Sequence, residues 1–338
     1  MRPGLSLFAT LLVFIGSVAH AQNKVVFSVP GIIIPDLPIH YAVHGGFMAK
    51  HGLDAHIQQT DRRDLATIAV ISGDAVGSVT DPIEAAIAFR RGAGLKVVAG
   101  VAVNAPPFII GDKTVTADQK SWKGKTASLF TPPNTLYTLF MRELQNGGWK
   151  EVESNVYRLS ATDSSEQYLR ISLGKRGTEL PALLANRANL AVLHEPDAST
   201  AVVRGNMHVV KAFAGSFKEL LWSTLNVSSE AMKKRPDVIA RVVAGLNDAL
   251  ASLHESPERV TPITLKMFPS ADASVMARAV EGLVKAGIFP KSCMVTPEGW
   301  AANIGLLKLT NPAAPATDVS FSEIADMSFC KAAVARKK

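Results

Sequence analysis

The 338-residue chain is poor in cysteine: it has only Cys293 and Cys330, both in its last fifth. So few cysteines exclude the disulfide-dense scaffold of a small secreted domain and the thiolate cluster of a structural zinc site. Hydrophobic residues make up 47% of the sequence, which excludes a disordered chain. A chain of this length buries a large core, and we expect it to divide into two domains.

Long apolar runs are also scarce, and the one that stands out is at the N-terminus. Residues 5–18 are apolar, follow Arg2 and lead to Ala19-His20-Ala21. This is the pattern of a secretory signal peptide, and the run is shorter than the roughly 20 residues that a membrane-spanning helix needs. We therefore predict a signal peptide at residues 1–21, its cleavage, and a mature protein in the periplasm. An uncleaved N-terminal anchor is the alternative.

Export bears on the two cysteines, because thiols oxidise outside the cytoplasm. We predict a disulfide between Cys293 and Cys330, which would contribute roughly 3 to 4 kcal/mol in the chain-entropy model. Two free, buried thiols are the alternative. No cysteine lies beside the predicted cleavage site, so a cysteine-linked lipid anchor is not expected.

Positive charge is not concentrated in the sequence. The net charge is +7, and the basic residues are scattered apart from Arg336, Lys337 and Lys338 at the C-terminus. A nucleic-acid-binding protein gathers such residues on one helix or stripe. We therefore expect no nucleic-acid partner and a basic surface that serves solubility.

Motifs of catalysis and metal binding are missing or incomplete. Residues 124–126 resemble the end of a phosphate-binding loop, but Gln119 stands where glycine is required, and a strand pattern follows. There is no G-x-S-x-G elbow. His40 and His44 lie one helical turn apart without an H-E-x-x-H pattern. We expect no catalytic residues, no cofactor and no metal, and therefore a protein that is not an enzyme.

Strand and helix patterns alternate along most of the chain. Strands are predicted at residues 24–29, 53–58, 76–80, 95–101, 126–130, 155–160, 190–194, 208–213 and 221–227, and helices at 36–51, 61–72, after Asp81-Pro82, at 134–146, in the stretches up to 187, from 196, and at 236–255, 257–267, 273–286 and 297–309. This alternation predicts an α/β fold in which mainly parallel sheets are flanked by helices. The helical last third is expected to cover one lobe.

Several segments, in order, resemble one family. They are residues 38–42 (PIHYA), 46–54 (GFMAKHGLD), 71–77 (ISGDAVG), 92–99 (GAGLKVVA), 122–126 (WKGKT) and 191–196 (AVLHEP). Together they extend over about half of the predicted mature chain and resemble the type II periplasmic binding proteins of ABC importers. The similar branch takes up nitrate, sulfonates, taurine and thiamine precursors.

The resemblance implies two lobes with a small organic solute held between them. The chain is expected to cross near residues 104–108 and return near residues 213–222. This gives a first lobe of residues 22–105 plus 214–338 and a second lobe of residues 106–213. It also implies an ABC permease and its ATPase as partners, peripheral contact with the membrane transporter only, and a monomer.

Open α/β sheets bind ligands at the carboxyl ends of their strands, so loops after strands should form the site. The predicted ligand-binding residues are Asp36, Tyr41, Thr80, Asp81, Asn104, Asn134, Thr135, Leu136, Glu195 and Trp222. Tyr41, Tyr137, Phe108 and Trp222 could stack on a ring, with Tyr41 and Trp222 preferred, and core packing is the alternative for each. If Asp81 and Glu195 both face the ligand, it should carry amine or amide donors.

Simpler roles compete for these residues. Asp81 precedes Pro82 and is placed to cap a helix, a role also open to Asn134. Helix N-termini hold anions in the family that the chain resembles, but Pro132 and Pro133 remove amide donors here, which argues mildly against a simple oxyanion. Two other functions are the alternatives for a protein with this scaffold. One is an enzyme acting on a pyrimidine or chorismate-like substrate, and the other is a ligand sensor for a membrane receptor.

Overall fold

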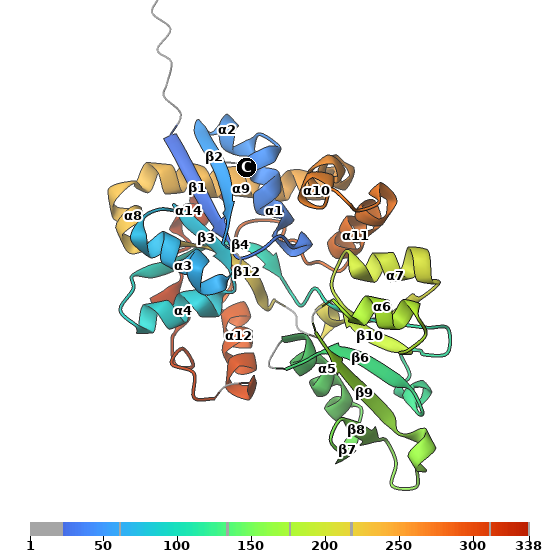
Figure 1. Ribbon diagram of the computed structural model, residues 1–338. Helices are drawn as coiled ribbons and strands as arrows, with labels where there is room; N and C mark the ends of the chain where they lie inside the picture. Colours follow the sequence, from blue (N-terminus) through green and yellow to red (C-terminus); the bar gives the residue numbers. More distant parts are fainter. Residues whose placement is uncertain are drawn as a thin grey trace, which may run out of the picture.

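The computed structural model describes residues 23–60, 62–132, 135–175, 177–216, 219–310 and 312–336. Two β-sheets, each flanked by helices, build two bodies that we call the first and the second lobe (Figure 1). The first sheet has the order β2-β1-β3-β12-β4, and the second β11-β5-β10-β6-β9-β8-β7. The predicted signal peptide lies outside the described residues.

The first sheet consists of β1 (Asn23–Val29), β2 (Leu53–Gln59), β3 (Gly77–Thr80), β4 (Leu95–Val103) and β12 (Leu221–Ser228). The second consists of β5 (Phe108–Gly111), β6 (Thr126–Phe130), β7 (Lys150–Glu153), β8 (Val156–Arg158), β9 (Leu169–Gly174), β10 (Leu190–Leu193) and β11 (His208–Ala212). The chain therefore leaves the first sheet after β4, builds the second, and returns in β12. The exact lobe boundaries at residues 105, 106, 213 and 214 stay a prediction.

The sheets are mixed, where the sequence predicted mainly parallel ones. β1 is parallel to β2 and β3, and β6 is parallel to β9 and β10. β12 is antiparallel to β3 and β4, and β5 is antiparallel to β10 and β11. β5 and β12 are the strands that arrive directly from the other lobe. Each starts at the edge facing that lobe, where its neighbours β4 or β10 end, and so runs against them.

Helices of the first lobe are α1 (Leu37–His44), α2 (Phe47–Lys50), α3 (Arg63–Ser72) and α4 (Pro82–Arg90), with the short 3-10 helix η1 (Ile34–Asp36) before α1. The single helix predicted at residues 36–51 is wrong. Gly45 and Gly46 divide it: Gly46 has φ +82°, and a Cβ on Gly45 would lie 2.6 Å from the Tyr41 carbonyl oxygen. Only glycine accepts both conditions without strain.

The second lobe contains α5 (Thr135–Asn146), α6 (Glu179–Leu184) and α7 (Asp197–Gly205), with the 3-10 helices η2 (Gln119–Trp122), η3 (Ser165–Gln167) and η4 (Phe213–Gly215). The sequence wrongly predicted helix through residues 169–174, which form β9. Leu169 and Ile171 are buried there, while Arg170 and Ser172 are exposed. That period of two is the strand signal, and the helical prediction overlooked it.

The C-terminal region is helical, as predicted. It contains α8 (Ser229–Lys234), α9 (Pro236–Glu255), the 3-10 helix η5 (Pro257–Val260), α10 (Thr261–Met267), α11 (Ala273–Lys285), α12 (Pro297–Thr310), α13 (Phe321–Ile324) and α14 (Ser328–Ala335). α9 packs against α1 and α14 on the first lobe, whereas α11 packs against α7 of the second (Figure 1). The predicted disulfide between Cys293 and Cys330 is confirmed and is fully buried.

Apolar clusters stabilise the lobes, and the largest of them extends from the first lobe into the second, where it includes Ile110, Leu183 and Leu193. In the second lobe, the rings of Trp122 and Phe140 stack with centroids 5.9 Å apart, and both side chains are almost fully buried. α12 touches both lobes, because Leu306 packs against this cluster and Leu307 against a cluster of the first lobe. α12 thus forms a wall beside the junction of the lobes.

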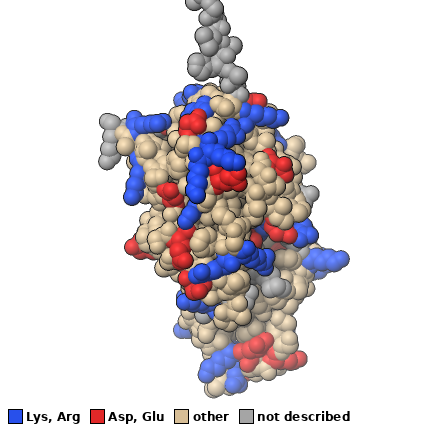
Figure 2. Space-filling model, turned by 90° about the vertical axis from the view of Figure 1, so that its left-hand side faces the viewer, with Lys and Arg blue, Asp and Glu red and all other residues tan. Residues whose placement is uncertain are grey.

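The surface shows basic side chains spread over one face with acidic side chains between them (Figure 2). No helix among the described residues has the length and apolar composition required to cross a bilayer.

Candidate functional site

A cavity of ≈ 620 Å³ lies at the junction of the lobes. Its lining residues come from the first lobe (Pro30, Ile33, Asp36, Arg63, Val79, Thr80, Asp81, Ile83, Glu84, Ile87), the second lobe (Pro132, Thr135, Tyr137, Thr138, Met141), the return crossing (Leu220, Leu221, Trp222, Ser223) and α12 (Asn303, Leu306, Leu307). The volume suits a small organic molecule, since ligand pockets generally measure about 300 to 1,000 Å³.

Chain topology explains why these residues meet. Pro30 follows β1, Thr80 ends β3, and Pro132 lies just beyond β6. Parallel strands place such positions on one edge of each sheet, and the two edges face one another. The return crossing brings Trp222 and Ser223 to the same edge. The sequence-based expectation of a site built from loops after strands therefore agrees with the position of this cavity.

Asp36 is the buried carboxyl of the cavity, with 2% of its surface exposed. Its Oδ1 atom and the Ser223 hydroxyl oxygen have no hydrogen-bond partner among the described residues. Burial raises the pKa of Asp36 to about 7, although the nearby Ser223 hydroxyl and the positive charge of Arg63 act in the opposite direction. Asp36 is therefore largely protonated below neutral pH and has an oxygen free for a ligand.

Asp81 has two structural roles at once. Its Oδ1 atom accepts the Ile83 N–H at 2.9 Å and caps α4, while the residue also lines the cavity. Burial raises the pKa of Asp81, against the opposing effects of Arg63 and the Ile83 amide. Capping and cavity lining, which the sequence left as alternatives, occur together. Its neighbour Thr80 is buried and its hydroxyl accepts a 2.9 Å hydrogen bond from Asn226 Nδ2.

Glu84 and Arg63 complete the charges of the cavity, and the sequence analysis missed both. Burial raises the pKa of the half-buried Glu84, and the charge of Asp81 raises it further. Arg63 begins α3 and is exposed to solvent. Both stand in the first turn of a helix that follows a strand, and this position was the available signal. Among its described lining residues, the cavity thus has three carboxyl groups, of which Asp36 is buried, and one exposed guanidinium.

Aromatic side chains line the other walls. Trp222 is half-buried, and its ring meets that of His194 edge-on with centroids 5.6 Å apart. Tyr137 of α5 contributes from the second lobe, beside Met141 one turn later. Of the two aromatic residues preferred for stacking on a ligand, Trp222 is at this cavity.

The start of α5 divides the predicted residues. Thr135 lines the cavity, whereas Leu136 packs against the apolar cluster of the second lobe. Asn134 lies outside the described residues.

Asn104 is not among the residues that line the cavity. Its backbone is left-handed, with φ +61°. Its Nδ2 atom donates to the Gly287 carbonyl at 2.8 Å, and its Oδ1 atom accepts the Glu219 N–H at 2.6 Å. Both ends of the amide therefore connect the outgoing crossing to other segments of the chain.

Glu195 also lies away from the cavity lining. Its two carboxyl oxygens accept the Ser199 N–H at 2.9 Å and the Ser199 hydroxyl at 3.0 Å, at the start of α7. Burial raises the pKa of Glu195, while these hydrogen bonds and the positive charge of Arg278 act in the opposite direction. These hydrogen bonds satisfy an amide and a hydroxyl in the first turn of α7, which is the role of a helix cap.

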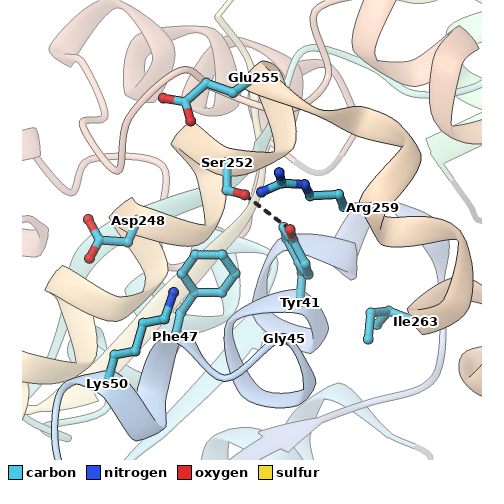
Figure 3. Close-up of a pocket in the computed structure, with 9 residues that line it drawn as sticks. All are labelled: Tyr41, Gly45, Phe47, Lys50, Asp248, Ser252, Glu255, Arg259 and Ile263. Atoms are coloured by element: carbon cyan, nitrogen blue, oxygen red, sulfur yellow. Dashed lines mark hydrogen bonds between the residues drawn. The ribbon is translucent and has the colours of Figure 1, made fainter.

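Tyr41 lines a different pocket, of ≈ 590 Å³, between α1, α2 and α9 (Figure 3). Its hydroxyl and that of Ser252 are 3.0 Å apart, and its ring packs edge-on against Phe47. This outer pocket shares no lining residue with the cavity between the lobes. Tyr41 is therefore not placed to touch a ligand held at the lobe junction.

Metal-binding side chains do not gather within the described part of the chain: it holds no group of three or more His, Cys, Asp and Glu residues suited to a metal ion. His40 and His44 have ring centroids 6.1 Å apart. Burial, together with the charge of His44, lowers the pKa of His40 to about 4. His40 is thus a neutral, packed side chain.

Comparisons with known proteins place the chain near one family. The model of the NMT1/THI5-like family matches residues 36–169. No curated protein sequence matches the chain.

Solved structures share its fold at low identity. The aliphatic sulphonate-binding protein SsuA of Escherichia coli has 16% identity, covers 89% of this chain and 91% of its own, and gives a TM-score of 0.63. The nitrate-binding protein NrtA of Synechocystis PCC 6803 has 12% identity, covers 94% and 89%, and gives 0.63. A cysteine-to-serine mutant of DszB in complex with biphenyl-2-sulfinic acid has 11% identity, covers 93% and 99%, and gives 0.64. These structures confirm the two-lobed type II fold, and the NMT1/THI5-like match agrees with the family that the sequence resembles.

Proposed function

We propose that this protein is the periplasmic solute-binding component of an ABC importer. It captures a small organic molecule between its lobes and delivers it to a membrane permease driven by an ATPase. The observation that carries the proposal is the cavity at the lobe junction, which is lined from both lobes. Such a cavity closes when the lobes approach one another around a ligand.

The sulfonate- and nitrate-binding proteins of similar fold support this function. Sulfonates and nitrate are therefore ligand classes to test on this protein, because the sequence identities to these relatives are only 16% and 12%. The predicted signal peptide supports a periplasmic location, and a single chain suffices to form the cavity, as expected for a monomer.

The binding function requires that the captured molecule leaves unchanged. Both cysteines of the chain are joined in the disulfide, so it offers no free thiol as a nucleophile. Asp36 nevertheless favours a second candidate, an enzyme acting on a pyrimidine or chorismate-like substrate. A carboxyl group with a pKa of about 7 in a cavity is suited to general acid–base chemistry.

A thermal-shift screen followed by recovery of the ligand separates these functions. The purified protein is mixed with sulfonates, nitrate, aminopyrimidines, aromatic acids, ureas and amines, since a ligand that binds only the folded state raises Tm. The compound that raises Tm is then released and weighed by mass spectrometry. We expect recovery of the same compound, one molecule per chain; a converted product would instead establish the enzyme.

A further inference from the structure

We propose that the cavity selects a protonated amine on an aromatic or branched apolar body, with Asp36 Oδ1 and Asp81 facing the ammonium group. This inference rests on the proposed function and specifies the solute. It differs from the sulfonate and nitrate named for the structural relatives.

The distribution of charge gives the first argument. Asp36, Asp81 and Glu84 line the cavity with carboxyl groups, and Arg63 is the one cation among its described lining residues. Arg63 is exposed, where water and salt weaken its field, whereas Asp36 is buried. An ammonium group that enters the cavity is therefore attracted by the carboxyl groups inside it. A sulfonate group would be repelled by the same carboxyl groups.

The unsatisfied oxygen atoms give a second, independent argument. Asp36 Oδ1 and the Ser223 hydroxyl oxygen line the cavity from residues with 2% and 3% of their surface exposed, and neither has a partner in the described structure. Buried polar atoms without partners are costly, so a native site that keeps them is arranged for a ligand or water to satisfy them. An ammonium group has three N–H donors and matches acceptors in this geometry.

Helix starts near the cavity are poor anion sites here. α4 begins with Pro82, which has no N–H, and the Asp81 carboxyl already accepts the Ile83 amide. Before α5, Pro132 and Pro133 likewise lack N–H groups. α4 therefore offers few of the free amides that usually hold an oxyanion, and the two prolines before α5 add none from the loop.

The remaining walls fit an apolar body. Trp222, Tyr137 and Met141 face it from the return crossing and α5, and Leu306 and Leu307 from α12. Aromatic and thioether side chains favour a ring or a branched chain, and cations also interact well with aromatic faces.

Ionisation of Asp36 makes the selection depend on pH. Among the described residues, the charge that acts on Asp36 is that of Arg63 on α3, and the carboxyl groups that share the cavity with it are Asp81 before α4 and Glu84 on α4. Because the pKa of Asp36 is about 7 in the free protein, amine binding below that pH must displace its proton. The affinity for an amine should fall by up to about tenfold for each pH unit below 7, whereas an anion would bind better there.

Matched probes test the inference by isothermal titration at pH 8. Tryptamine is compared with indole-3-acetate, and 2-phenylethylamine with 2-phenylethanesulfonate. The variants are Asp36→Asn, Arg63→Gln and, as control, Asp318→Asn, which removes an exposed carboxylate paired with Arg90. We expect an amine to bind, Asp36→Asn to weaken its binding at least tenfold, and the control Asp318→Asn to change it less than threefold. Arg63→Gln removes a cation from the cavity lining and should not weaken amine binding.

Two outcomes would overturn the inference. If the acids bind in preference to the amines and Arg63→Gln weakens them, the cavity is an anion site, and the proposed binding function stands without the amine. If neither these probes nor any compound of the thermal-shift screen binds, the proposed function itself fails and the inference fails with it.

Discussion

Asn104 and Glu219 join the two chain segments that cross between the lobes. The Oδ1 atom of Asn104, on the outgoing crossing, accepts the N–H of Glu219, on the return crossing, at 2.6 Å. Both residues have left-handed backbones, with φ +61° and +64°, and Glu219 also accepts a hydrogen bond from the Thr296 hydroxyl. The hydrogen bonds of Asn104 thus lie where a relative motion of the lobes would bend the chain.

Replacing Asn104 with alanine should lower the free energy of unfolding by about 1 to 3 kcal/mol. The change leaves the Glu219 amide and the Gly287 carbonyl without their partner, and alanine tolerates the left-handed backbone less well. Chemical denaturation measures the loss. Asn155→Ala is the control, because Asn155 has φ +62° but its amide bonds only to the adjacent Ser154. Equal losses in the two variants would show that the crossings gain nothing from Asn104.

Asp36 should make the stability of the ligand-free protein depend on pH. Burial raises its pKa from 3.8 to about 7, so the folded state binds this proton more tightly than the unfolded chain does. The contribution of Asp36 to the free energy of unfolding is complete below about pH 4 and is lost as the pH rises toward 7. In this range the free energy of unfolding falls by up to about 1.4 kcal/mol per pH unit.

The comparison of wild type with Asp36→Asn isolates this contribution from other titrating groups. The free energy of unfolding of both proteins is measured by denaturant titration from pH 4 to pH 8. As the pH rises, the wild type should lose stability relative to the Asp36→Asn variant. A difference that stays constant with pH would show that Asp36 titrates normally.

The disulfide should stabilise the C-terminal region. It closes a loop with a sequence separation of 37 residues and ties the segment before α12 to α14. In the chain-entropy model, removing it with Cys293→Ser and Cys330→Ser costs roughly 3 to 4 kcal/mol. Thermal and denaturant unfolding of the double variant, compared with the oxidised wild type, tests this. The reduced wild type should match the double variant, and a loss below 1 kcal/mol would contradict the prediction.

Glu195 should matter for stability and not for affinity. Glu195→Ala removes both acceptors of Ser199 in a buried site, which should cost about 1 to 3 kcal/mol. Asp272→Ala is the control: it removes the cap of α11 at an exposed position, where the cost is about 1 kcal/mol. Ligand affinity should be unchanged in both variants. Weaker ligand binding in Glu195→Ala, but not in Asp272→Ala, would show that Glu195 contributes to the binding site.

The sequence predicted those features that depend on neighbouring residues. The Asp81-Pro82 pair marked the start of α4, and the strand at residues 126–130 has the predicted bounds. The disulfide was also predictable, because only two cysteines are present. Asp36, Thr80, Asp81 and Thr135 follow from the rule that loops after strands form the site, and Trp222 from its position near the return crossing. The structure brings all five to the cavity.

Features that depend on distant segments could not be predicted in this way. α12 contributes Leu306 and Leu307 from a helical region that the sequence could only assign to covering a lobe. In the sequence, Glu195 and Asn104 look like ligand-binding residues in loops. In the structure, they form hydrogen bonds with Ser199 and Glu219 instead. Which partner a polar side chain finds is decided by tertiary packing.

The proposed function requires that the cavity between the lobes, and no other pocket, captures the solute. Native mass spectrometry of the protein with the compound that raises its Tm tests this most directly, using two space-filling variants. Met141→Trp fills the lobe cavity, and Ser252→Trp fills the outer pocket beside Tyr41. Circular dichroism and cooperative unfolding first establish that both variants fold. We expect a one-to-one complex for wild type and Ser252→Trp that is lost in Met141→Trp. Loss of the complex in Ser252→Trp with retention in Met141→Trp would show that the outer pocket holds the solute.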